Sequence, residues 1–359
     1  MPEKTYRLPL LRHYPELKEK IPRISLGAFP TPVHPLRHLG YENLWIKRDD
    51  LSSSVYGGNK IRKLEFILAE ARQRKTRHLI TIGGIGTNHG LATAIFCDKL
   101  GIECTLLLFW QPVTANVKQN LLLFRKYNAQ TIYKKTLWRT VLCYYLLYRI
   151  KHPGACFVFA GGSNPAGTIG FVNAAFELKE QVDRGDMPEP AVIICPLGSG
   201  GTLAGLSLGV QLAGLKTRVI GVRVTESHLG PFQTCTKSTV EKLIRQTYRY
   251  LTKRSASIPA ITISVPEILE EFFGNGYGVP TQDGTTAYCA VKEKENIILD
   301  PTYTAKTFAA VMEYCRMHQG DQSPVLYWHT YNSLDLSAQA DSVDCRDLPE
   351  PLQRFLKQE

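Results

Sequence analysis

One lysine in the sequence stands where an amine could act as a nucleophile. Lys60 follows Gly57, Gly58 and Asn59 and begins a stretch of helical character, IRKLEFILAEAR. The backbone N–H dipoles of a first helical turn disfavour the lysine cation, so they lower its pKa and make the amine more reactive toward a carbonyl. The preceding glycines permit close approach of a ligand to the backbone. The alternative is an ordinary exposed lysine at the start of a helix.

A second motif is typical of a phosphate site. Gly198, Ser199, Gly200, Gly201 and Thr202 follow the apolar run VIIC and precede LAGLSLG. The N–H groups of such a loop can surround an anion at a helix N-terminus, with help from the Ser and Thr hydroxyls. The loop lacks the lysine of an ATP-binding P-loop and the glycine spacing of a dinucleotide fold. Together, a reactive lysine and a phosphate loop indicate pyridoxal phosphate.

The elements that must position these motifs alternate between short β-branched runs and helical stretches, which predicts a parallel α/β sheet covered by helices. Three of the expected strands run into loops rich in Gly, Ser, Thr or Asn that precede a helix. Ligands of open α/β sheets bind at such strand ends, so we expect one shared cleft. The expected strands are 44–50, 78–84, 103–109, 129–134, 156–162, 191–198, 217–224 and 324–330.

The length of 359 residues favours two domains, at roughly 100–200 residues each. We expect a small domain over 52–158, inserted into a large cofactor-binding domain made of 1–51 and 159–335. The C-terminal tail, 336–359, is polar and broken by prolines, and we assign it no role in the core.

Composition narrows the class of protein. The nine cysteines form no Cys-x-x-Cys pair and the nine histidines show no ligand spacing, so we expect reduced thiols, a cytoplasmic protein and no metal site. The apolar stretch from Leu137 to Ile150 contains Arg139 and Arg149 and is too short to span a membrane. The net charge of +11 is spread along the chain without a nucleic-acid motif. We therefore expect neither a nucleic-acid nor a membrane partner.

Five motifs, in order along the chain, resemble the D-cysteine desulfhydrase and 1-aminocyclopropane-1-carboxylate deaminase family. They are SSSVYGGNKIRKLE at 52–65, TNH at 87–89, GGSN at 161–164, GSGGT at 198–202 and LDPTYTAK at 299–306. The resemblance extends from about residue 24 to about residue 334. It implies a two-lobed fold of the tryptophan synthase β-like class (fold type II), with pyridoxal phosphate between the lobes. It also implies a homodimer and a small amino-acid substrate.

The resemblance also assigns roles to residues of the cleft. Lys60 resembles the lysine that holds pyridoxal phosphate covalently, and Lys63 resembles a lysine that binds the phosphate. Thr87, Asn88 and His89 resemble the loop that binds the substrate carboxylate, with Asn88 also near the cofactor. A helix N-terminus suits that anion. His89 as a packing residue and Lys63 as a solvated charge are the alternatives.

Four further residues are assigned in the same way. Tyr277 and Tyr303 resemble two active-site tyrosines that contact substrate and help to move protons, although a lone tyrosine can also serve packing. Thr330 resembles the residue that meets the pyridine nitrogen, where a neutral hydroxyl gives a weaker electron sink than a carboxylate would. Thr304 and Thr330 favour a desulfhydrase, because the deaminases resemble PVYE and a leucine at these places.

The chain departs from the family in two places. Gly86-Thr87 stands where the family has Gln-Ser, and Tyr331-Asn332 stands where it has two glycines. We expect a lyase that converts D-cysteine to pyruvate, ammonia and hydrogen sulfide, with Lys60, Thr87, Tyr277 and Tyr303 as the catalytic candidates. The alternatives are a 1-aminocyclopropane-1-carboxylate deaminase that yields 2-oxobutanoate, a pyridoxal phosphate-binding protein of lapsed or regulatory function, and a basic nucleic-acid binder.

Overall fold

Six strands form one sheet in the computed structural model, which describes residues 8–229 and 232–357. Their order is β1-β2-β12-β7-β8-β11, and every neighbouring pair is parallel except β1 with β2. β12 is the last strand in the sequence but lies between β2 and β7, so the sheet joins segments from both ends of the chain. The strands are β1 (Val33–Pro35), β2 (Leu44–Arg48), β7 (Val192–Leu197), β8 (Arg218–Arg223), β11 (Glu267–Leu269) and β12 (Val325–His329).

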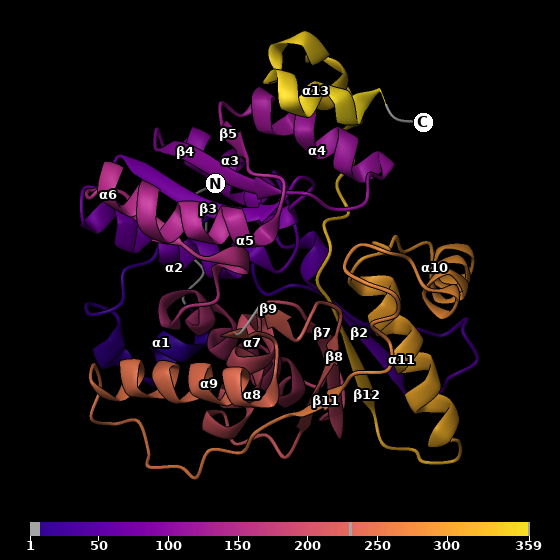
Figure 1. Cartoon of the computed structure of the whole chain (residues 1–359). Coiled ribbons are helices and arrows are strands. Elements are labelled where there is room, and N and C mark those ends of the chain that lie inside the picture. Colours follow the sequence, from indigo (N-terminus) through magenta and orange to yellow (C-terminus); the bar gives the residue numbers. More distant parts are fainter. Residues whose placement is uncertain (1–7, 230–231, 358–359) are drawn as a thin grey trace, which may run out of the picture.

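Helices cover both faces of this sheet (Figure 1), because successive side chains of a strand point to opposite faces. In β7, Ile193 and Cys195 pack with α7, α8 and α9, while Val192 and Ile194 pack with α10 and α11. The helices on the first face are α1 (Pro9–His13), α7 (Pro165–Asp183), α8 (Gly201–Leu212) and α9 (Lys237–Thr252). Those on the second face are α10 (Gln282–Glu295) and α11 (Thr304–Met317). A short hairpin, β9 (His228–Leu229) and β10 (Phe232–Gln233), precedes α9.

A second, four-stranded sheet is entirely parallel, in the order β5-β4-β3-β6. α2, α3 and α4 share one hydrophobic core with one face, and α5 with the π-helical segment Cys143–Tyr148 packs on the other. The strands are β3 (His78–Gly84), β4 (Glu103–Phe109), β5 (Gln130–Tyr133) and β6 (Cys156–Val158). The helices are α2 (Lys60–Gln73), α3 (Asn88–Lys99), α4 (Ala115–Lys126), α5 (Leu137–Leu142) and α6 (Arg149–Lys151).

All eight expected strands are present, and the predicted parallel α/β class is confirmed. The expected strand 156–162 ends early, because Gly161 and Gly162 have positive φ angles of 73° and 63°, which strands do not accommodate. β1, β9, β10 and β11, which are only two or three residues long, were not predicted from the sequence. The domain limits at 52–158 stay a prediction.

The expectation that the C-terminal tail has no role in the core is wrong. The tail forms α12 (Ser337–Asp341) and α13 (Glu350–Leu356). Leu348, Leu352 and Phe355 are at most 3% exposed and belong to the core that contains α3 and α4. Their spacing gives the tail a narrow apolar stripe, and the Phe355 ring packs edge-on against Tyr133. A few apolar residues at helical spacing are enough to hold such a segment on α4.

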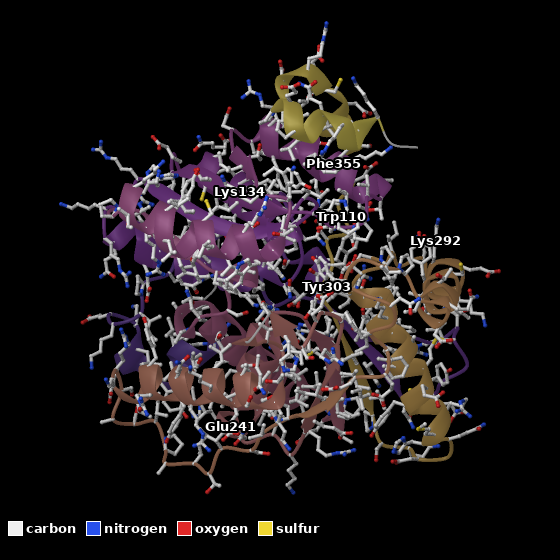
Figure 2. The ribbon with its side chains drawn as sticks, viewed as in Figure 1. Trp110, Lys134, Glu241, Lys292, Tyr303 and Phe355 are labelled. Carbon is white, nitrogen blue, oxygen red and sulfur yellow. The ribbon has the colours of Figure 1, made fainter. Side chains whose placement is uncertain are left out.

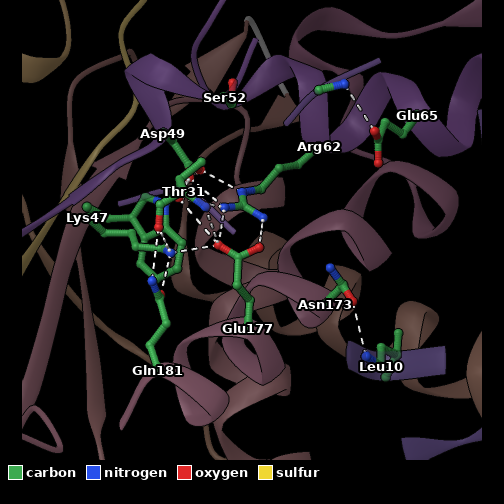
Figure 3. A network of polar contacts seen from close by, with 12 residues as sticks. Leu10, Thr31, Lys47, Asp49, Ser52, Arg62, Glu65, Asn173, Glu177 and Gln181 are labelled. Carbon is green, nitrogen blue, oxygen red and sulfur yellow. Dashed lines mark hydrogen bonds and ion pairs between the residues drawn. The ribbon is translucent and has the colours of Figure 1, made fainter. Parts of the chain in front are cut away.

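A buried ionic network fixes the helix that begins at Lys60 (Figure 3). On α2, Arg62 donates to Asp49 at 2.7 Å and to Glu177 at 2.9 Å. Lys47 of β2 donates to the other oxygen of Glu177 at 2.6 Å. The indole N–H of Trp328, on β12, donates to Asp49. These groups carry two positive and two negative charges, so the network is neutral and ties α2 to α7 and to the six-stranded sheet.

Candidate active site

A cavity of about 550 Å³ lies between the two sheets. Its wall consists of the start of α2 and the loops that follow β3, β6, β7 and β12, so the predicted shared cleft is present. Figure 2 shows Tyr303 in this region between the two halves of the molecule. Twelve of the candidate residues line the cavity: Lys60, Lys63, Thr87, Asn88, His89, Gly198, Ser199, Gly200, Thr202, Tyr277, Tyr303 and Thr330. The two candidates outside the lining are Gly201 and Thr304.

Lys60 is the first residue of α2, and its amine points into the cavity region beside Asn59. Its Nζ donates to Oδ1 of Asn59 at 2.9 Å. Removal of the amine from water disfavours its cation and lowers the pKa of Lys60 to about 8, while the charge of Asp300 acts in the opposite direction. About a tenth of this amine is therefore neutral at pH 7, far more than for a lysine of ordinary pKa. Neutral lysine can attack a carbonyl or accept a proton.

The loop after β7 forms a compact anion cradle at the N-terminus of α8. The Ser163 hydroxyl accepts a hydrogen bond from the Gly201 N–H at 2.9 Å and lies 2.7 Å from the Ser199 hydroxyl. Lys63 donates to Ser163 at 3.3 Å and to the Gly161 carbonyl at 3.0 Å. Burial, and then the charge of Lys60, lower the pKa of Lys63 well below its usual value. Two amines and a helix N-terminus thus meet in one place.

These residues fit pyridoxal phosphate. Among the described residues, no carboxylate forms an ion pair with Lys60 or Lys63, so a phosphate would supply the missing negative charge. Gly161 leaves no room for a side chain in the cradle: an added Cβ would lie 2.0 Å from the Ser199 hydroxyl oxygen and 2.8 Å from the Ser199 Cβ. When held there by its phosphate, the cofactor would share the cavity with the amine of Lys60.

Replacement of Gly201 by alanine tests the cradle. An added Cβ would lie 2.6 Å from Oγ of Ser163 and 2.8 Å from Nζ of Lys63, so both side chains must move away from the phosphate position. We expect Gly201→Ala to weaken pyridoxal phosphate binding at least about tenfold, or about 1.4 kcal/mol, in a titration of the apoenzyme. Gly154→Ala is the matched control, because no atom lies within 4 Å of that Cβ position. Equal affinity of the two variants would contradict the cradle.

The predicted carboxylate loop caps α3. The Thr87 hydroxyl accepts from the Gly90 N–H at 3.2 Å, and Asn88 is held by a hydrogen bond from Asn120 at 3.2 Å. His89 is 4% exposed, and its Nε2 lies 3.1 Å from the Thr81 hydroxyl. Its Nδ1 is buried without a partner. Burial and the two cavity lysines lower the pKa of His89 well below its usual value, so this ring is neutral.

Two tyrosines meet across the cavity. The hydroxyls of Tyr277 and Tyr303 are 2.5 Å apart, and their rings pack edge to face. Burial raises the pKa of Tyr277 to about 12 and that of Tyr303 well above its usual value. Both hydroxyls therefore keep their protons at neutral pH. They are suited to donate a proton to a group that leaves as an anion.

Asp300 lies in the motif LDPTYTAK at 299–306 but was not among the predicted site residues. Asp300 lines the cavity and is 3% exposed. Its carboxylate accepts from the N–H groups of Thr302, Tyr303 and Thr304. It thereby fixes the turn that presents Tyr303. An aspartate three to four residues before a helix start is the signal that could have indicated this turn.

Thr304 does not face the cavity. It is fully buried, and its hydroxyl donates to Asp300 at 2.7 Å. Thr330, which follows β12, does line the cavity, and its carbonyl accepts from the Asn59 N–H at 3.1 Å. Of the two threonines that favoured a desulfhydrase, only Thr330 lies where a ligand would bind.

The residues that replace two family glycines also line the cavity. The Asn332 side chain accepts from the Gly57 N–H at 2.7 Å, so it supports the loop before Lys60. The Tyr331 hydroxyl accepts from Asn116 at 3.2 Å. Each of the larger side chains is thus held by a hydrogen bond at the cavity wall.

The outer part of the cavity contains polar residues that no sequence motif marked. They lie on α9 or in the segment before it. Polar side chains are common at exposed positions, so nothing in the sequence distinguished these residues. The group consists of Glu226, His228, Gln233, Thr234, Lys242 and Gln246.

The sequence and the fold are similar to those of known proteins. The family described as "Pyridoxal-phosphate dependent enzyme" matches residues 24–330. A Thermotoga maritima protein, provisionally named a 1-aminocyclopropane-1-carboxylate deaminase, is 33% identical over 328 residues, which cover 89% of this chain and 98% of that protein. The D-cysteine desulfhydrase of Serratia proteamaculans is 32% identical and covers 87% of this chain and 94% of its own length.

A solved structure described as an ACC deaminase homologue has a TM-score of 0.76 and 28% identity. It covers 94% of this chain and 99% of its own chain. The predicted cofactor, fold class and family are confirmed by these matches. The chain is a pyridoxal phosphate-dependent enzyme and belongs to the family that contains D-cysteine desulfhydrases and 1-aminocyclopropane-1-carboxylate deaminases.

Proposed function

We propose that the enzyme degrades D-cysteine by β-elimination. The observation that carries this proposal is the arrangement of Lys60 and the Tyr277–Tyr303 pair in one cavity. A neutral amine and protonated hydroxyls of raised pKa are the base and the acid that elimination requires. Thr330 supports the choice of a thiol substrate, on the resemblance described above.

Each group of the cavity has a part in this reaction. The N-terminus of α3 and Thr87 bind the substrate carboxylate, and Ser163, Ser199 and Lys63 hold the phosphate of the cofactor. Bound pyridoxal phosphate supplies an electron sink for the pair left at Cα. Lys60 accepts the Cα proton at Nζ.

The tyrosine pair completes the elimination. Tyr303 donates a proton to the departing sulfur, and Tyr277 stabilises the resulting phenolate through their short hydrogen bond. The C–S bond breaks as its electron pair leaves with sulfur. Addition of one water to the remaining three-carbon product releases ammonia, so D-cysteine and water give pyruvate, ammonia and hydrogen sulfide.

A comparison of products tests the substrate. We expect the purified holoenzyme to release sulfide and pyruvate in equal amounts from D-cysteine, and to turn over L-cysteine at least about tenfold more slowly, a difference of about 1.4 kcal/mol. Release of 2-oxobutanoate from 1-aminocyclopropane-1-carboxylate without sulfide from D-cysteine would assign the deaminase reaction instead. Absence of any product from either substrate in a cofactor-loaded sample would favour a lapsed or regulatory protein.

A further inference from the structure

A continuous helical stretch on the four-stranded sheet carries an exposed apolar face. α5, the π-helical segment and α6 follow one another without a break from residue 137 to residue 151. Of the eleven large apolar side chains that are exposed among the described residues, six lie on this stretch, each 45–77% exposed. These six form the apolar face: Trp138, Leu142, Tyr145, Leu146, Leu147 and Ile150. Such a concentration on a surface indicates a binding site.

The opposite side of the same stretch is anchored in the protein. Val141 and Tyr144 are buried against Ile80, Ile82 and Leu107 of the sheet. In Figure 1, α5 and α6 lie across the outer side of this sheet. The inward side of this helical stretch is therefore already packed in the core. The outward side chains, which form the apolar face, do not pack in any core that the described residues form.

All the charged residues in the part of the sequence that surrounds the apolar face are basic. No Asp or Glu occurs between Glu103 and Glu177, and this interval holds eight Lys and Arg residues. Five of the eight lie on the helical stretch or directly beside it: Lys134, Lys135, Arg139, Arg149 and Lys151. Arg139, Arg149 and Lys151 are exposed. A partner that covers this surface must offer both apolar groups and negative charge.

A second copy of the chain does not meet that requirement. In a two-fold symmetric contact the same patch is used by both copies, so the cations of both copies would be brought into one interface without an acidic residue of the stretch to pair with them. A nucleic acid would satisfy the charge but would leave the aliphatic side chains of Leu146, Leu147 and Ile150 in water. Helices that lie in the membrane interface combine Lys and Arg with Trp and Leu in this way.

We propose that residues 134–151 dock the enzyme on the surface of a membrane that contains anionic phospholipids. In the described part of the chain no helix is long and apolar enough to cross a membrane, so the proposed contact is peripheral. It departs from the sequence-based expectation of no membrane partner, which rested on the absence of a spanning segment. Trp138 and Tyr145 lie at headgroup level, as the amphipathic rings of these residue types do. Leu146 and Ile150 enter the acyl boundary. The inference goes beyond the reaction and does not depend on the identity of the substrate.

Vesicle flotation of the holoenzyme tests the apolar contact. With vesicles of phosphatidylcholine and phosphatidylglycerol in equal amounts, we expect binding at least about tenfold stronger than with phosphatidylcholine alone. Leu146→Ser with Ile150→Ser should abolish flotation. Ile298→Ser with Met317→Ser is the matched control, because these exposed apolar side chains lie outside the stretch. The visible absorbance of the bound cofactor and the melting temperature verify that each variant is folded.

A second pair of variants tests the charge. A basic residue near an anionic surface strengthens binding by about fivefold, the equivalent of about 1 kcal/mol. Arg139→Gln with Lys151→Gln should therefore weaken flotation about twenty-fivefold. Lys292→Gln with Lys294→Gln on α10 removes the same charge elsewhere and should leave it unchanged.

Three results would overturn the proposal. Equal binding to neutral and anionic vesicles would remove the role of the cations. In the second result, the wild type does not float and the Leu146→Ser and Ile150→Ser pair converts an oligomer to monomers. That result would assign the apolar face to an interface between copies of this chain. Salt-sensitive binding to an RNA or DNA oligonucleotide without vesicle binding would assign the surface to nucleic acid.

Discussion

The Lys60→Ala enzyme is expected to lose turnover of D-cysteine by at least about a thousandfold. It is also expected to lack the visible absorbance that the covalently held cofactor gives. Lys60 is the cavity amine whose pKa is lowered to about 8, and its replacement removes both the attachment point and the base. Absorbance spectra and a sulfide assay check the two effects on one sample. Lys99→Ala, an exposed position at the end of α3, is the control.

The role of Lys60 can also be tested by measuring how the rate of cofactor attachment depends on pH. The lowered pKa means that the reactive neutral amine predominates above about pH 8 and declines below it. In wild-type apoenzyme, the rate of attachment should rise about tenfold per pH unit below that value and level off above it. An unchanged spectrum in the Lys60→Ala variant would refute the assignment of Lys60 as the attachment point. So would a rate of attachment that levels off only at about pH 10, the ordinary pKa of a lysine.

Glu177→Gln is expected to cost about 3–5 kcal/mol of stability, which lowers the melting temperature of a chain of this length by about 4–7 °C. Glu177 is 1% exposed and receives hydrogen bonds from Lys47 and Arg62. Replacement of the Glu177 carboxylate by a neutral amide leaves one buried cation of the network without a compensating negative charge. The carboxyl prefers to be ionised, since the charges of Arg62 and then Lys47 outweigh desolvation and lower the pKa of Glu177 far below its usual value.

A nearby carboxylate provides the control for this prediction. Glu180 lies one turn away on α7 and pairs with Arg12 at the surface, where such pairs contribute about 0–1 kcal/mol. Glu180→Gln should therefore change the melting temperature by a few degrees at most. The double variant Lys47→Met with Glu177→Gln restores neutrality and should recover part of the loss. A Glu177→Gln enzyme that melts like the wild type would contradict the network's stabilising role.

Local sequence signals predicted the features that depend on short segments. Runs such as VIIC and LITI have the β-branched composition of buried strands, and the glycines that follow them mark the turns into helices. Because parallel strands end at one edge, the loops near Thr87, Ser163 and Ser199 could be placed together from the sequence alone. Twelve of fourteen candidate residues line the cavity, but others among them, such as Tyr277, Tyr303 and Thr330, were assigned by the family resemblance. The homodimer and the cytoplasmic location stay predictions.

Features that depend on side-chain direction or on distant contacts could not be predicted in the same way. Thr304 follows Tyr303 directly, yet its hydroxyl turns back to Asp300, whereas the Tyr303 ring enters the cavity. The sequence contains both residues but not the turn geometry that separates them. The packing of Phe355 on Tyr133 joins segments more than two hundred residues apart. Residue spacing alone carries no signal for such a contact.

The position of β12 has a consequence for synthesis of the chain. Leu44 of β2 pairs with Val325 of β12, so the six-stranded sheet cannot close until β12 has left the ribosome. The strands of the four-stranded sheet all lie between residues 78 and 158, and their contacts span far less sequence. Short loops close faster than long ones. The smaller sheet can therefore form while the rest of the chain is still being translated, whereas β7, the strand that leads into the anion cradle, gains its partner β12 only later.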